Sequence, residues 1–184
     1  RDAEKNGKLP KIVMPVHFAG QSCDMINIKK LSKKYGFKII EDASHAIGGV
    51  YKNTKIGSCK FSDITVFSFH PVKIITTAEG GCATTNDENI FEKLKLLSSH
   101  GVTRNPKNMV KKTLDRWVYD QISIGFNYRM SDLNAALGLS QLLRIDSFIN
   151  KRNKIAKKYF QQLKNLDLKL PKQEDYNSSA LHLF

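Results

Sequence analysis

A lysine at position 73 has the surroundings that an amine nucleophile needs. Lys73 follows an apolar run at 64–69 and precedes a double glycine. A second apolar run, at 37–40, ends in the polar sequence EDASHA at 41–46. Because open α/β sheets bind ligands beyond the carboxyl ends of their strands, these polar groups would meet at one edge. Lys73 could then form a Schiff base while Asp42 faces a pyridinium nitrogen.

Each of these side chains also has a simpler explanation. An isolated lysine usually lies on the surface, and a carboxylate such as that of Asp42 often caps a helix. Ser68, before Lys73, could donate to a phosphate or be an ordinary strand hydroxyl. His45 could contact a cofactor's phenolic oxygen or be a buried, hydrogen-bonded histidine. The combination of these residues, rather than any one of them, indicates a cofactor site.

The elements that would position these groups follow from the hydrophobic pattern. Residues 11–18 predict a buried strand and residues 37–41 a second one, joined by a helix that Asp24 begins and Gly36 ends. Such a strand–helix–strand unit predicts a parallel pair. The other expected elements are an exposed hairpin or loop at 51–55, strands at 64–69 and 82–85, helices from 86, 131 and 145, and a long loop at 102–122.

Composition limits the class of protein. Lys and Arg number 30 against 17 Asp and Glu, a net charge of +13. The lysines form scattered pairs without interleaved aromatics, which favours a solvated surface or attraction for an anionic small substrate over nucleic-acid binding. The apolar runs are too short to cross a bilayer, and the first residues do not resemble a signal peptide. Three widely spaced cysteines, with no metal-ligand spacing, indicate reduced thiols in a cytoplasmic protein.

Four motifs occur in order along the chain. They are EDASHA at 41–46, FSFHPVK at 67–73, EGG at 79–81, and NYRMSD at 127–132 followed by AALG at 135–138. Together they resemble the pyridoxal-phosphate-dependent sugar aminotransferases of the DegT/DnrJ/EryC1/StrS family. The resemblance implies an α/β fold with a mostly parallel sheet and flanking helices, part of the large domain of a fold-type I, aspartate aminotransferase-like enzyme.

The resemblance also implies a role for each motif residue. Lys73 corresponds to the lysine that holds pyridoxal 5′-phosphate, and Asp42 to the partner of the pyridine nitrogen. His45 falls where the family has His or Gln near the ring oxygen, and Ser68 at the phosphate serine. Asn127 corresponds to an asparagine that reaches the phosphate of the neighbouring subunit's cofactor, which implies a homodimer with shared active sites.

The activity implied is transamination of a nucleotide-linked 4-keto-6-deoxy sugar, with glutamate as donor. Residues 117–129 are most similar to family members that act in pseudaminic acid synthesis. The alternatives are a related sugar dehydratase, a non-catalytic regulator and a basic nucleic-acid-binding module. Dehydratases of the family carry histidine in place of the Schiff-base lysine, so Lys73 argues against them.

Family members are considerably longer than this sequence. The resemblance therefore implies that residues 1–145 are a partial cofactor-binding large domain. Residues 146–184 would be a connecting helix and the start of a C-terminal small domain.

Overall fold

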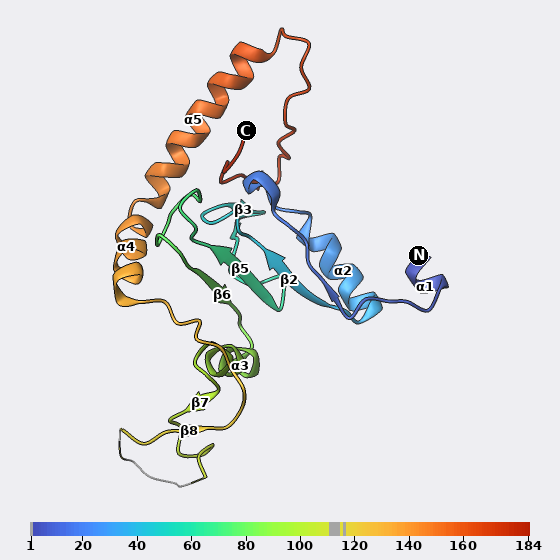
Figure 1. Ribbon diagram of the computed structural model, residues 1–184. Coiled ribbons are helices and arrows are strands. Elements are labelled where there is room, and N and C mark those ends of the chain that lie inside the picture. The colour runs from blue at the N-terminus through green and yellow to red at the C-terminus, as the bar shows by residue number, and fades with distance from the viewer. Residues whose placement is uncertain (1, 111–114, 116) are drawn as a thin grey trace. The chain divides into compact units, whose positions relative to one another are not determined.

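The computed structural model describes residues 2–110, 115 and 117–184 (Figure 1). The chain forms two compact units, which we call the sheet unit (residues 1–86 and 132–184) and the α3 unit (residues 87–131). This division does not test the domain boundary predicted at residue 145, which stays a prediction.

A four-stranded sheet forms the centre of the sheet unit. Its strand order is β1-β2-β5-β6. β1 pairs in parallel with β2 and β2 with β5, whereas β6 is antiparallel to β5 (Figure 1). The strand bounds are Ile12–Val13, Lys38–Asp42, Ile64–Ser68 and Gly81–Thr84. The predicted α/β class with a mostly parallel sheet is confirmed.

The first strand is much shorter than predicted. Of residues 11–18, only Ile12–Val13 pairs with β2, and Val16 makes one further bridge with Asp42. Pro15 has no N–H to donate to a ladder and interrupts the strand, while its carbonyl accepts the N–H of Asp42 at 2.9 Å. The side chain of Val16 is 47% exposed. The expectation of a continuous buried strand was therefore wrong.

The helix between the first two strands begins and ends as predicted. α2 spans Met25–Tyr35. The carboxylate of Asp24 accepts the N–H of Asn27 at its start. Gly36 ends it in the left-handed conformation with φ of 78°, which a side chain would strain. Local sequence signals are therefore sufficient to define this helix.

Two buried apolar clusters hold the sheet unit together. The first joins α2 to the sheet and contains Met25, Phe37, Ile39 and Tyr51. The second lies under the loop that carries Lys73 and contains Ile74, Ile75, Ile149 and Ala180.

A small second sheet joins distant parts of the sequence. β3 (Val50–Tyr51) and β4 (Thr54–Lys55) form the predicted hairpin, turning through two residues with positive φ. β9 (Asn177–Ser178) pairs with the other edge of β3, because the tail after α5 runs back to the hairpin (Figure 1). Lys52, Asn53 and Lys55 are exposed as expected, whereas Tyr51 is 2% exposed and belongs to the buried core.

The later helices of the sheet unit occur where they were predicted. α4 spans Asp132–Leu142 and α5 spans Ile145–Leu163. Gly138 is the buried residue of α4, and an added Cβ there would meet Thr77. The side chain of Leu133 is 84% exposed. Two short helical segments, α1 (Asp2–Lys5) and the 3₁₀ turn η1 (Phe18–Gly20), lie near the start of the chain.

The described residues of the α3 unit form one helix and one strand pair. α3 spans Glu88–Ser98, and the Asp87 carboxylate accepts the N–H of Ile90 at its start. Within the predicted loop at 102–122, β7 (Val102–Thr103) pairs in antiparallel fashion with β8 (Asp120–Gln121). Residues 111–114 and 116 of that loop lie outside the described residues. None of the helices in the described ranges is both long and apolar enough to cross a lipid bilayer.

Candidate functional site

The strand ends bring the predicted carboxylate and amine to one edge of the sheet. Asp42 is the last residue of β2, and the parallel neighbour β5 ends at Ser68. Lys73 lies in the turn that follows, where its N–H donates to the carbonyl of His70 at 2.9 Å. The charge of Lys73 affects the pKa values of both Asp42 and His45. These three side chains therefore share one electrostatic environment at this edge of the sheet.

Asp42 is held as a charged acceptor. Its Oδ1 accepts the N–H of Ser44 at 3.0 Å and the hydroxyl of Ser44 at 2.6 Å. Burial alone would raise the pKa of Asp42, but the hydrogen bonds from Ser44 and the nearby charges of His45 and Lys73 lower it below its usual value. The carboxylate is thus ionised at neutral pH, and it lies at the end of a strand rather than at a helix start, so the helix-cap alternative does not describe it.

His45 is held as a neutral ring. The backbone N–H of Ala19 donates to its Nδ1 at 3.3 Å, a contact that only an unprotonated nitrogen can accept. Burial and the charge of Lys73 lower the pKa of His45, although Asp42 opposes them. The ring contacts those of Phe18, at 5.6 Å between centroids, and His182, at 4.4 Å.

His182 was not expected at this site. It belongs to none of the four motifs, but the tail returns to the strand ends and places this imidazole beside His45. Arg152 of α5 holds the tail by donating to the carbonyls of Leu181 and His182 at 3.1 and 3.3 Å. Burial lowers the pKa of His182 to about 4, with smaller effects from the charges of His45, Lys73 and Arg152. No local pattern signals this contact, because it depends on a long-range return of the chain.

The two predicted phosphate contacts lie in different units. Ser68 ends β5, and its Oγ accepts the N–H of His70 at 3.4 Å. Asn127 belongs to the α3 unit, where it forms an antiparallel bridge with Ser99. Ser68 therefore lies in the same unit as Asp42, His45 and Lys73, at the end of the strand next to β2, whereas Asn127 lies in the α3 unit. The roles of these residues in holding a cofactor stay predictions.

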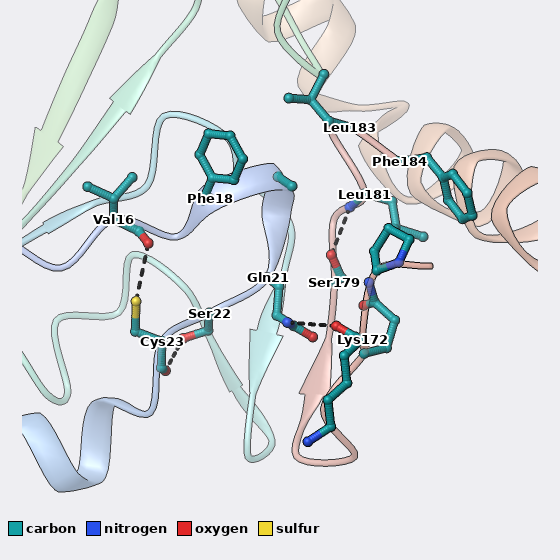
Figure 2. Close-up of a pocket in the computed structure, with 13 residues that line it drawn as sticks. Val16, Phe18, Gln21, Ser22, Cys23, Lys172, Ser179, Leu181, Leu183 and Phe184 are labelled. Atoms are coloured by element: carbon teal, nitrogen blue, oxygen red, sulfur yellow. Dashed lines mark hydrogen bonds between the residues drawn. The ribbon is translucent and has the colours of Figure 1, made fainter. Parts of the chain in front are cut away.

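A cavity of about 360 Å³ lies next to this edge (Figure 2). The segment around Phe18 and Cys23 forms one wall, and the tail with Leu181 and Phe184 forms the other. Its lining is mostly apolar and does not include Asp42 or Lys73. We therefore assign the chemistry to the strand ends and not to this cavity.

A buried charged group lies directly behind the candidate site. Glu41 precedes Asp42 in β2 and points to the opposite face of the sheet. Its Oε2 lies 2.7 Å from Nε2 of His17, and its Oε1 accepts hydrogen bonds from the hydroxyls of Ser62 and Thr65. Burial would raise the pKa of Glu41, but these contacts lower it, so the strand carries a fixed carboxylate on each face.

A mostly parallel sheet that presents a lysine and an ionised aspartate at its strand ends is the arrangement of an α/β cofactor enzyme. The model of the DegT/DnrJ/EryC1/StrS aminotransferase family matches residues 4–184, and the chain belongs to this family. It is 45% identical over 170 residues to a UDP-4-amino-4,6-dideoxy-N-acetyl-beta-L-altrosamine transaminase of Campylobacter jejuni, a match that covers 92% of this chain and 42% of the relative.

Solved structures of the family have the same fold. The Helicobacter pylori aminotransferase PseC, described as involved in pseudaminic acid biosynthesis, matches with a TM-score of 0.78 and 36% identity over 92% of this chain and 43% of that one. A putative sugar aminotransferase of Streptococcus pneumoniae in its PLP form matches with a TM-score of 0.79 and 31% identity over 95% and 47%. The chain thus spans less than half the length of these relatives.

Proposed function

We propose that this chain is the cofactor-binding part of a pyridoxal-phosphate-dependent transaminase. Its substrate would be a nucleotide-linked 4-keto-6-deoxy sugar, converted to the 4-amino sugar with glutamate as donor, in the synthesis of pseudaminic acid or a related surface glycan. The observation that carries the proposal is the ionised Asp42 beside Lys73 at one edge of a parallel sheet. The names of the relatives in Campylobacter and Helicobacter support the substrate class.

The chemistry of the donor set fits pyridoxal phosphate. Asp42, charged and only partly buried, would hold a proton on the pyridine nitrogen. The hydroxyl of Ser68 would donate to the phosphate, and the neutral ring of His45 would lie near the phenolic oxygen. When bound, the cofactor supplies an electron sink that stabilises a carbanion.

Lys73 would supply both the attachment point and the proton transfer. Its side chain is half-buried and directly precedes the buried residues Ile74 and Ile75, and an amine at this position could form a Schiff base with a carbonyl group. Once displaced by the amino donor, the same amine would take a proton from one carbon and return it to another.

The active form would be a cytoplasmic homodimer with two shared sites. The apolar side chains of α4 and of the residue that follows it support this assembly, because Leu133 and Leu139 of the helix are 84% and 61% exposed and Leu143 is 82% exposed. Asn127, shortly before this helix, would then serve the partner's cofactor. The three free cysteines accord with a reducing compartment.

Adduct mapping tests the assignment of Lys73. We expect added pyridoxal phosphate to produce a near-visible absorbance band, and borohydride to fix the cofactor on the peptide that contains Lys73. Lys73→Ala should abolish both signals, whereas Lys60→Ala, a change at an exposed lysine, should retain them. Equal labelling of the Lys73→Ala variant would contradict the proposal. In turnover assays of a chain as long as the relatives, a product without a new amino group would favour the dehydratase alternative.

A further inference from the structure

The loop that carries Lys73 has no regular structure of its own. Residues 69–80, between β5 and β6, form neither a helix nor a strand. The carbonyl of Phe69 accepts the hydroxyl of Thr76 at 2.9 Å and the N–H of Thr77 at 3.0 Å, so the chain returns to the point where the loop began. Lys73 lies between these two ends. The position of its amine therefore depends on how the returning side of the loop is held.

One side of α4 holds this returning side at two points. Near the start of the helix, the side-chain amide of Asn134 donates to the carbonyl of Glu79 at 3.0 Å. Further along the helix, Oε1 of Gln141 accepts the N–H of Thr76 at 2.9 Å. The two helix residues are separated by nearly two full turns and therefore lie on the same side of α4. Both ends of the segment 76–79 are thus fixed to one helix.

Between these two contacts, Gly138 lets α4 and the loop approach closely. It is the buried residue of the helix, and any side chain there would meet Thr77, which is itself 2% exposed. On the other side of Lys73's loop, Ile74 and Ile75 pack into an apolar cluster. Apolar packing is not directional, whereas hydrogen bonds weaken steeply when they are bent. The hydrogen bonds from α4 therefore fix the orientation of the loop.

Gln141 supplies the side-chain hydrogen bond from α4 that lies nearest to Lys73 in sequence. The N–H of Thr76 is a main-chain donor in a half-buried position, and Gln141 is its acceptor. Without that acceptor the N–H would have to turn towards water, because leaving a buried donor unpaired is unfavourable. Such a turn would displace the returning side of the loop, and Lys73 with it. A reacting group that is misplaced by about 1 Å can lose roughly a hundredfold in rate.

We propose that Gln141 is a positioning residue for Lys73 and acts through Thr76. It fixes the direction in which the loop presents the amine, while Asn134 fixes the far end of the same segment. The role rests on the proposed function, in which Lys73 holds the cofactor and transfers the proton. The helix α4, and not the loop itself, then sets the place of the amine.

Borohydride fixation of pyridoxal phosphate on the 184-residue chain tests the role of Gln141. Gln141→Met keeps the length of the side chain but removes the acceptor, and we expect it to slow labelling of the Lys73 peptide by about tenfold. Gln141→Glu keeps an acceptor oxygen and should restore the wild-type rate. Labelling of the exposed Lys60 in the same sample is the internal reference and should not change. Gln162→Met, at an exposed position of α5, is the matched control and should label as wild type does.

Amide hydrogen exchange of the free chain needs no cofactor. We expect the N–H of Thr76 to exchange about tenfold faster in Gln141→Met than in wild type, and at the wild-type rate in Gln141→Glu. Thermal melts would show that each variant is folded. Equal labelling of Gln141→Met and wild type, equal loss in Gln141→Glu, or unchanged exchange at Thr76 would overturn the role of Gln141.

Failure of the proposed function would give a different result. If the wild-type chain is not labelled at Lys73, the assignment of the cofactor lysine fails, and the exchange rates alone decide whether α4 holds the loop. Faster exchange in Gln141→Met would then support the contact, and unchanged exchange would refute it.

Discussion

The buried carboxylate behind Asp42 should be a major source of stability in the sheet unit. The side chain of Glu41 is 6% exposed, and that of its partner His17 is fully buried. Replacing Glu41 by alanine would leave the ring N–H of His17 and the hydroxyl of Ser62 without their acceptor. Each buried unsatisfied donor costs about 1–3 kcal/mol, and breaking a buried pair costs about 3–5 kcal/mol. We therefore expect Glu41→Ala to lower the free energy of unfolding by about 3–5 kcal/mol.

Urea unfolding followed by far-ultraviolet circular dichroism measures this loss. The control is Glu92→Ala, whose side chain is 54% exposed and whose replacement should change stability by less than about 0.5 kcal/mol. Glu41→Gln keeps the shape of the side chain and one acceptor oxygen, so its loss of unfolding free energy should lie between that of the control and that of the alanine variant. It also provides a measurement if the alanine variant does not fold. A loss below about 1 kcal/mol in Glu41→Ala, with an unchanged denaturant slope, would refute this reasoning.

Four further predictions follow from the site and its supports. Asp42→Asn should slow transamination by orders of magnitude while the protein stays folded, since each ~1.4 kcal/mol added to the activation barrier lowers the rate tenfold. Near-normal turnover would show that Asp42 takes no part in the reaction. The pKa of His182 is about 4 in the folded protein and 6.5 in the unfolded chain. Between these pH values the unfolded chain binds more protons, so the free energy of unfolding should fall as the pH drops from 6.5 towards 4. His182→Gln should flatten that slope in urea titrations across the range. Mixing Lys73→Ala with Asn127→Ala chains should restore activity if sites are shared, and no recovery would argue for unshared sites. Gly138→Val, which crowds Thr77, should cost about 1–3 kcal/mol in the same unfolding assay.

Elements defined by local chemistry could be predicted from the sequence. The limits of α2 depend on the Asp24 carboxylate and on the positive φ of Gly36, both properties of single residues. The strand that ends at Asp42 and the neighbour that ends at Ser68 were visible as apolar runs with polar ends. Their parallel pairing then places Asp42 and Lys73 at one edge, which is why the centre of the candidate site could be predicted.

Features that depend on distant pairing could not be predicted in this way. Residues 11–18 are apolar enough for a strand, yet they pair with β2 only before and after Pro15, at Ile12–Val13 and at Val16. The tail carries no strong strand pattern, and β9 forms because β3 offers a free edge. His182 reaches His45 only through that return. In each case the stabilising contact is made with a residue that lies far away in the sequence.

The return of the tail has a consequence for the time course of folding. The amide of Asn177 donates to the carbonyl of Ser22 across 155 residues of sequence, and the N–H of His182 donates to the carbonyl of Ala19. Contacts of such separation form slowly, because the entropy of closing the loop is lost before the contact is gained. During synthesis, the segment around Ala19 cannot make these contacts until His182 has emerged from the ribosome. The face that holds His45 is therefore expected to become ordered only after residues 177–182 have been made, and to remain exposed to chaperones until then.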